Sequence, residues 1–391
     1  MVKISPFQPV YFNGNYCEVT SPPFDSINKE MEKNLKRCSE NVTHLTLPDN
    51  ENYTYARVKI LEWIDSGVLK RAEKPVLVLI DQSFNHSGKI LRRTGIISLV
   101  DVFLDDGYVK PHEKTFIGPV KERMKVLGEM RTQPEPIFLA VNDRELEPLL
   151  QGMVAEREAV FSFTDGNGVL NSVYFLDEEE QLDRIVKLLK NDSAMVADGH
   201  HRLEASRRLA GERSGTEKNF WSSVMAYITS MNSPGLFVSG IHRIVKTNIE
   251  IDSFLNRLAE YFLVNDKPPV SGKDFITVYL DRYYYLLPPE NNSTEGYKIN
   301  FQSPIHALNT VIFNEIMGID SEGMDTEMEF THDEKYAVDE VRKGRATAAF
   351  IMPDWDRENL FRIVLSDGVL PQKSTYFHPK VHSGIVLNVL F

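Results

Sequence analysis

Residues 195–202, Met-Val-Ala-Asp-Gly-His-His-Arg, place an acid, a glycine, two imidazoles and an arginine at the junction of two elements. The apolar residues before Asp198 predict the end of a buried strand, and the segment from Leu203 to Ala210 has the composition of a helix. A glycine turn at a helix N-terminus presents unpaired backbone N–H groups and the positive end of the helix dipole. With the guanidinium of Arg202, these groups predict a binding site for phosphate or another oxyanion.

The same turn has further interpretations. If the turn binds phosphate, the backbone amides of residues 199–201, from Gly199 onward, must face one point. Asp198 is then a candidate ligand for Mg²⁺, because a hard cation prefers carboxylate and phosphate oxygens. Alternatively, Asp198 caps the helix while His200 and His201 pack locally. Adjacent histidines point about 100° apart on a helix, so the pair is a poor chelate and a zinc site is not expected there.

A second candidate is the segment 110–115, Lys-Pro-His-Glu-Lys-Thr, which lies after a strand and before a predicted helix. A carboxylate beside a histidine and a lysine has the composition of a general base, with Glu113 as the base and His112 beside it. A solvated, charged loop has the same composition, and this segment alone does not separate the two.

The third candidate is the segment 370–380, Leu-Pro-Gln-Lys-Ser-Thr-Tyr-Phe-His-Pro-Lys, which is dense in hydrogen-bond donors. This composition suits a segment that closes over an anionic ligand. The candidate ligand residues are Lys373, Ser374, Thr375 and His378. The alternative is an exposed turn whose two aromatic residues pack into the core.

A fourth candidate is the pair His242 and Arg243, which lies within the apolar run Gly-Ile-His-Arg-Ile-Val. The alternation of side chains along a strand sends one of the two inward. An inward Arg243 needs a carboxylate or a ligand as its partner, whereas an outward Arg243 needs neither.

Short strands and helices alternate throughout the chain, so the fold class is α/β or mixed α+β. Strands are predicted at 75–80, 96–100, 136–141, 173–176, 223–229, 236–246, 276–280, 346–351 and 385–389. Helices are predicted at 26–36 with Ser26 as N-cap, 55–67, 119–130, 178–190, 252–262, 304–317, 333–342 and 355–366. A change in composition predicts a domain boundary near 247–252.

The bulk composition narrows the class of protein. A chain of 391 residues that is 42% hydrophobic is long enough for two or three globular domains. Its net charge of −12 argues against a protein that binds nucleic acid by broad phosphate neutralisation. Two cysteines without zinc-site spacing favour a reducing cytoplasm, and no apolar run approaches the length of a membrane span.

Six segments together resemble a bacterial and archaeal family, domain-of-unknown-function family 1015, over nearly the whole chain. They are Ser-Pro-Pro-Phe-Asp at 21–25, His-Glu-Lys-Thr at 112–115, Gln-Pro-Glu-Pro at 133–136, Ala-Asp-Gly-His-His-Arg-Leu-Glu-Ala at 197–205, Asn-Ser-Pro-Gly-Leu at 232–236 and Pro-Gln-Lys-Ser-Thr-Tyr-Phe-His-Pro-Lys at 371–380. The chain departs from the family pattern at Ile241, where a threonine is expected before His242 and Arg243.

A more distant resemblance covers roughly residues 105–391. The order His-Glu, helix, strand, Asp-Gly-His-His-Arg is similar to that of archaeal free-serine kinases, whose fold is shared with ParB proteins and sulfiredoxin. The resemblance implies a ParB/sulfiredoxin-like nucleotide-binding core at 91–248, an N-terminal extension at 1–90 and a C-terminal α/β domain at 249–391 that closes the cleft.

This resemblance also implies roles for residues. Glu113 would be the general base, and residues 198–202 would hold nucleotide phosphates. The expected activity is phosphoryl transfer from ATP or ADP, with Mg²⁺, to the hydroxyl of a small metabolite such as free serine. The candidate residues for binding substrate or phosphate are His242, Arg243, Lys373, Ser374, Thr375 and His378. The alternative is a nucleotide-binding switch or nucleotide hydrolase of the ParB type, which has no acceptor. The expected partners are a nucleotide and a metabolite, without nucleic acid or membrane.

Overall fold

The computed structural model describes residues 2–86, 88–103, 108–113, 115, 117–190, 192–269, 275–288, 303–320, 324–366 and 368–391. Contacts divide the chain into two compact units. The first comprises Met1–Leu236, Phe361–Gly368 and Pro379–Phe391, and the second comprises Phe237–Leu360 and Val369–His378. The first unit therefore contains both the expected N-terminal extension and most of the expected core. The expected boundary at residue 90 falls inside a strand, Lys89–Asp101.

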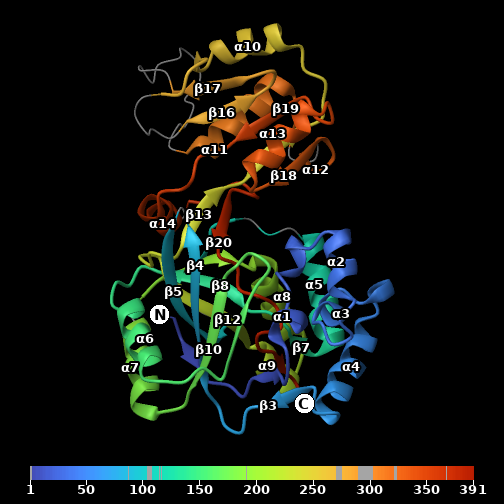
Figure 1. Cartoon of the computed structure of the whole chain (residues 1–391), viewed down its shortest axis with the longest axis vertical. Coiled ribbons are helices and arrows are strands. Elements are labelled where there is room, and N and C mark those ends of the chain that lie inside the picture. The colour runs from blue at the N-terminus through green and yellow to red at the C-terminus, as the bar shows by residue number, and fades with distance from the viewer. Residues whose placement is uncertain are drawn as a thin grey trace. The chain divides into compact units, whose positions relative to one another are not determined.

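A nine-stranded mixed sheet organises the first unit (Figure 1). Its order is β6 (Val109–Pro111), β11 (Ala194–Asp198), β8 (Ile137–Val141), β12 (Ser223–Ser230), β5 (Lys89–Asp101), β4 (Leu77–His86), β10 (Leu170–Leu176) and β9 (Phe161–Thr164), and β1 (Ile4–Ser5) pairs with β5. β11 runs parallel to β6, and β12 runs parallel to β8. The carboxyl ends of two parallel strands, β6 and β11, therefore lie side by side.

One face of this sheet is covered by helices. The alternating residues Ile137, Leu139 and Val141 of β8 point into a core that also contains Leu150 and Leu209 from two of these helices. The helices of this region are α5 (Ile117–Met130), α6 (Leu146–Ala155), α7 (Glu179–Leu189), α8 (His200–Glu212) and α9 (Gly215–Trp221). Their apolar residues recur at helical spacing, so each helix buries one face.

Buried polar residues on neighbouring strands occupy the other face of the sheet. Gln82 of β4, Arg93 of β5 and Asn171 of β10 are fully buried, although they are polar or charged. A polar group without water needs protein partners, and the Gln82 side chain donates to Asn171 Oδ1 over 2.9 Å. This face also contacts the backbone of the returning segment at Pro379 and Lys380.

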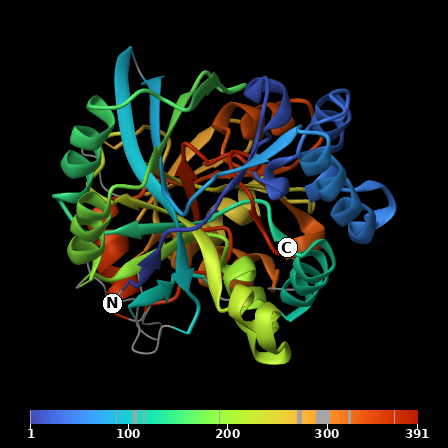
Figure 2. The ribbon, with the colours of Figure 1, turned by 90° about the horizontal axis from the view of Figure 1, so that it is seen from below.

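Smaller elements complete the first unit. They are α1 (Tyr16–Val19), α2 (Lys29–Leu35), α3 (Thr43–Thr46), α4 (Tyr53–Asp65), the pair β2 (Val10–Phe12) and β3 (Leu69–Arg71), and the pair β7 (Thr132–Gln133) and β21 (Asn388–Val389). In Figure 2 the blue helices lie at the right of the strands, and the green α6 and α7 lie at the left. Asn28 caps α2 by accepting from Met31 N, so Ser26 is not the cap that the sequence predicted. Ser26 instead ends a short 3₁₀ turn, Phe24–Ser26.

A six-stranded antiparallel sheet organises the second unit. Its order is β15 (Leu263–Asn265), β17 (Tyr283–Leu287), β16 (Ile276–Tyr279), β19 (Ala348–Ile351), β14 (His242–Val245) and β18 (Met328–Thr331). A separate ribbon joins β13 (Phe237–Gly240) to β20 (Thr375–His378). The helices are α10 (Ile251–Ala259), α11 (Pro304–Ala307), a π-helical segment (Leu308–Met317), α12 (Met324–Glu327), α13 (Glu334–Arg342) and the start of α14 (Arg357–Leu365).

The expected mixed α/β class is confirmed, as are the helices expected at 55–67, 119–130, 178–190, 252–262 and 333–342. The single strand expected at 236–246 is two strands, because the chain changes partners at Gly240: β13 pairs with β20, whereas β14 pairs with β18 and β19. Within the part of the chain that the structure describes, no helix has both the length and the apolar character needed to cross a membrane.

Candidate functional site

Two of the sequence motifs meet at one edge of the nine-stranded sheet. In the parallel pair β6 and β11, Val109 lies opposite Ala194 and Pro111 lies opposite Val196. His112 and Glu113 directly follow β6, and Asp198 and Gly199 end β11 and open α8. The carboxyl ends of strands are where α/β sheets commonly bind ligands. Strand pairing therefore brings the His-Glu motif and the Asp-Gly-His-His-Arg motif together.

His112, in the first of these motifs, is buried against the second. Its Nδ1 hydrogen-bonds to the carbonyl of Val196, and its backbone N–H donates to His200 Nε2 over 3.4 Å. The two imidazole rings lie edge to face, with centroids 4.6 Å apart. Because a backbone carbonyl can only accept, Nδ1 carries the proton, and Nε2 of the neutral ring carries the lone pair.

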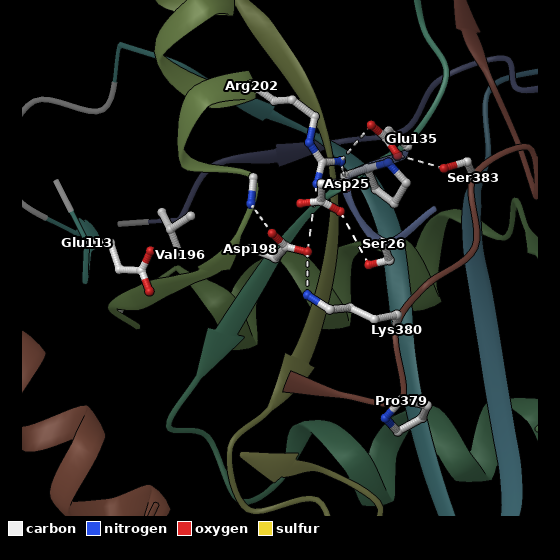
Figure 3. A network of polar contacts seen from close by, with 12 residues as sticks. Asp25, Ser26, Glu113, Glu135, Val196, Asp198, Arg202, Pro379, Lys380 and Ser383 are labelled. Carbon is white, nitrogen blue, oxygen red and sulfur yellow. Dashed lines mark hydrogen bonds and ion pairs between the residues drawn. The ribbon is translucent and has the colours of Figure 1, made fainter. Parts of the chain in front are cut away.

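Glu113 lies beside this histidine. Its Oε1 is 3.6 Å from His112 Nε2, and its side chain is 18% exposed. Figure 3 shows Glu113 next to Val196, to one side of the polar network around Asp198. The pKa of His200 is lowered to about 3, mainly by burial and then by His112, while the carboxylates of Glu113 and Asp198 oppose that shift. Glu113 and Asp198 thus act on the same imidazole.

Gly199 forms the turn between β11 and α8. Its φ is +88°, in the left-handed region, and a Cβ there would lie 2.8 Å from Ile137 Cγ2 and 3.1 Å from Ile137 Cα. Glycine is the residue that adopts this φ without strain and also leaves room for Ile137. Among the described residues, no side chain caps α8, and a helix N-terminus of this kind is a common position for a bound anion. The strand, turn and helix predicted for this segment are confirmed, with the helix beginning at His200 and including His201 in its first turn.

Asp198 is surrounded by hydrogen-bond donors (Figure 3). Its Oδ1 accepts from Gly199 N over 2.8 Å, and its Oδ2 accepts from Lys380 Nζ over 2.8 Å. Arg202 Nη2 lies 3.9 Å from Oδ2. Burial raises the pKa of the Asp198 carboxyl, but Lys380 and Arg202 outweigh burial and hold that pKa well below its usual value. Asp198 is therefore ionised at neutral pH.

Arg202 points into the protein. Its Nη1 donates to the carbonyl of Pro136 and lies 3.8 Å from Glu135 Oε1, and the two side chains are only 8% and 5% exposed. Ser383 Oγ donates to Glu135 Oε2 over 2.6 Å. Burial lowers the pKa of Arg202, but Glu135 and Asp198 raise it above its usual value. The Arg202 guanidinium, which the sequence predicts as part of a phosphate site, thus already binds protein acceptors.

Lys380, Glu135 and Ser383 contribute to this network, although none of them was among the site residues expected from the sequence. A signal was present for two of them, since Glu135 lies in the Gln-Pro-Glu-Pro segment and Lys380 ends the 371–380 segment, both of which match the family. Ser383 carries no such signal. Its position depends on an isolated bridge between Ser383 and Ser21, which is a long-range contact.

The other expected site residues belong to the second unit. His242 and Arg243 are both buried, so alternation does not send one of them outward, because β14 is buried on both faces. His242 Nδ1 accepts from Met352 N over 3.1 Å, and the pKa of His242 is lowered to about 4, mainly by burial and then by Arg243. Arg243 Nη2 donates to the carbonyl of Lys373 over 2.9 Å. Arg243 therefore has backbone carbonyls as partners.

The donor-rich segment, as far as His378, belongs to the second unit and is held by contacts with other residues of that unit. Ser374 is buried and its carbonyl accepts from Trp355 Nε1 over 2.9 Å. Thr375 and His378 begin and end β20, and Tyr376 between them stacks on His332 with centroids 4.2 Å apart. Lys373 is exposed and has a φ of +57°. This segment is thus a strand and its entry turn.

The donor set around Asp198 does not suit a directly bound Mg²⁺ ion. Both carboxylate oxygens accept hydrogen bonds, and Oδ2 already faces the ammonium of Lys380. A hard dication requires oxygen ligands rather than a second cation at this distance. In the described ranges, no three or more His, Cys, Asp and Glu side chains gather as a metal centre requires.

Solved structures with partial likeness to this chain have 10 to 13% identity to it. A conserved hypothetical protein from Pyrococcus furiosus has 13% identity and a TM-score of 0.39, and the match covers 74% of this chain and 95% of that one. A free serine kinase in complex with AMP has 12% identity and a TM-score of 0.41, over 74% and 92% of the two chains. SbnI from Staphylococcus aureus, with a C-terminal truncation, has 10% identity and a TM-score of 0.41, over 74% and 87%.

No curated protein matches the sequence. The model of a family of proteins of unknown function, DUF1015, matches residues 4–311, which is most of the chain and includes both motifs at the sheet edge. The chain therefore belongs to the DUF1015 family.

Proposed function

We propose that this protein binds ATP or ADP and transfers a phosphoryl group to the hydroxyl of a small metabolite such as free serine. The observation that carries the proposal is the parallel pairing of β6 with β11, which puts Glu113 and the Gly199 turn at one sheet edge. A carboxylate beside an anion-binding turn is the arrangement that phosphoryl transfer to an alcohol needs. The resemblance of the two motifs to those of free-serine kinases supports the same assignment.

In this proposal the Gly199 turn binds the donor phosphates. Backbone N–H groups at the start of α8 donate to phosphate oxygens, and the helix dipole adds positive potential. Arg202 lies behind the turn, where its buried positive charge balances Asp198 and Glu135. Mg²⁺ would be carried by the nucleotide phosphates rather than by Asp198.

Glu113 is the general base. The metabolite hydroxyl oxygen attacks the terminal phosphorus of the donor, the new oxygen–phosphorus bond forms, and the bond to the bridging oxygen breaks as ADP or AMP leaves. The hydroxyl proton passes to Glu113. His112 Nε2, which lies 3.6 Å from Glu113 Oε1, then accepts a hydrogen bond from the protonated carboxyl. Because Val196 fixes the His112 tautomer, this lone pair faces Glu113 in the neutral ring.

The direct test uses the wild-type protein with labelled ATP and, separately, labelled ADP, each with a pool of hydroxyl metabolites that includes serine. A new phosphorylated metabolite that requires the protein supports the proposal. Release of inorganic phosphate with no phosphorylated metabolite would instead support the nucleotide hydrolase or switch. If neither nucleotide binds in an equilibrium titration, the proposal is wrong.

A further inference from the structure

The ammonium of Lys380 lies against the carboxylate at the Gly199 turn. Lys380 Nζ donates to Asp198 Oδ2 over 2.8 Å, and the two side chains are 17% and 19% exposed (Figure 3). Lys380 belongs to the segment Pro379–Phe391, which rejoins the first unit after β20. A cation from the end of the chain therefore reaches the turn that the proposed function assigns to phosphate.

Buried side chains hold the backbone at Lys380. Arg93 Nη2 donates to the carbonyl of Pro379 over 2.6 Å, and Gln82 Nε2 donates to the carbonyl of Lys380 over 3.3 Å. Arg93 Nε also donates to Gln82 Oε1 over 3.1 Å, so the two anchors support each other. Since both anchors are fully buried, the Lys380 backbone is fixed, and only its flexible four-carbon side chain can redirect the ammonium.

Arg202 is the less suitable cation for a phosphate contact. Its guanidinium faces the buried Glu135 carboxylate and the carbonyl of Pro136. If Arg202 turned away, Glu135 would be left as a buried carboxylate without its cation, which is strongly unfavourable. If Lys380 turned away from Asp198, that carboxylate would keep the Gly199 N–H at 2.8 Å and Arg202 at 3.9 Å.

The Asp198 carboxylate accepts hydrogen bonds from donors of the kind that also bind phosphate oxygens, a backbone N–H and an ammonium. The Gly199 N–H and the Lys380 ammonium both donate to this carboxylate. We propose that Lys380 is the cation that contacts the phosphate group of the bound nucleotide, and that it turns from Asp198 to do so, while Arg202 holds the turn in place. This inference rests on the proposed function, because it assigns a further binding residue to the same site.

The experiment measures equilibrium binding of ADP and of inorganic pyrophosphate to the full chain. The variants are Lys380→Met, Lys380→Arg and the control Lys187→Met, whose lysine lies on α7 with a 77% exposed side chain. A charge-assisted hydrogen bond predicts that Lys380→Met weakens ADP binding roughly 10- to 100-fold. Lys380→Arg keeps the charge and loses less affinity, and Lys187→Met binds like the wild type.

The outcomes separate this inference from the proposed function. If Lys380→Met is folded and binds ADP as tightly as the wild type, the inference is wrong and the kinase proposal stands. If Lys380→Met weakens the binding of pyrophosphate but the wild type binds no ADP, Lys380 contacts phosphate and the nucleotide proposal is wrong. If the wild type binds neither ligand, both are wrong.

A second measurement covers the case in which Lys380→Met does not fold. The wild-type protein is treated with an amine-acetylating reagent, with and without ADP or pyrophosphate, and acetylation is followed by peptide mapping. Bound ligand should slow acetylation at Lys380 severalfold and leave Lys187 unchanged. An equal rate at Lys380 with and without a ligand that binds would overturn the inference.

Discussion

The backbone N–H of His112 donates to His200 Nε2 over 3.4 Å, although 88 residues separate the two histidines. This contact requires an unprotonated His200, since a protonated imidazole has no acceptor. It joins the loop after β6 to the first turn of α8, and so it links the segment that carries Glu113 to the segment that opens at Gly199.

Replacing Glu113 with glutamine should abolish phosphoryl transfer without abolishing nucleotide binding. The amide keeps the size of the side chain but cannot take a proton, and loss of a general base costs roughly 10²- to 10⁴-fold in turnover. The matched control is Glu129→Gln, which changes an exposed carboxylate on α5. Initial rates and a nucleotide titration measure the two effects. Wild-type turnover in Glu113→Gln would remove the assigned base.

Replacing Gly199 with alanine should destabilise the first unit, whereas Gly211→Ala on the same helix should not. Gly199 has a φ of +88°, and its added Cβ would lie 2.8 Å from Ile137 Cγ2, so a loss of about 2 kcal/mol is expected. A Cβ at Gly211 has no atom within 4 Å, and alanine there should be neutral or stabilising by up to about 1 kcal/mol. Urea denaturation compares the stabilities of the two variants, and equal unfolding midpoints would show that the position of Gly199 does not require glycine.

Stability should fall as the pH drops below about 6.5, and His200 should account for part of the fall. Burial and then His112 lower the pKa of His200 to about 3, from 6.5 in the unfolded chain. The unfolded state therefore takes up a proton first. The contribution of His200 is complete above pH 6.5 and declines as the pH falls toward 3.

Urea midpoints measured from pH 7.5 to 5.0 check this prediction, because most carboxylates titrate below that range and Asp192, whose pKa burial raises to about 6, is present in both proteins compared. The His200→Gln variant should show a flatter decline than the wild type over the same interval. Parallel curves for the two proteins would mean that His200 has no depressed pKa in the folded state.

Replacing Arg202 with methionine should be strongly destabilising, and adding Glu135→Gln to that variant should cost less stability than the same change costs in the wild type. Removing the guanidinium leaves Glu135 buried without its cation, which costs about 3 kcal/mol or more. The double variant Arg202→Met with Glu135→Gln removes that charge as well. Its loss of unfolding free energy should be smaller than the sum of the two single losses. Additive losses would show that the two side chains do not interact.

The secondary structure of short segments could be predicted from the sequence because it depends mainly on neighbouring residues. The strand, glycine turn and helix at 195–210 follow from an apolar run, a glycine and helical composition, and the structure confirms them as β11, Gly199 and α8. The position of Glu113 between a strand and a helix was predictable for the same reason. The direction of Arg243 was not, because the alternation rule assumes one exposed face, and β14 is buried on both faces.

The sequence by itself determined which residues can bind an anion or take a proton, and which of them lie together on one turn or one loop. Only the tertiary structure decided that Lys380 meets Asp198, 182 residues away, and that Arg202 faces Glu135 and Pro136. The physical reason is that backbone conformation depends on neighbouring residues, whereas side-chain partners depend on how distant strands pair and pack. The composition and periodicity of one chain therefore predict its backbone conformation but carry little information about its side-chain partners.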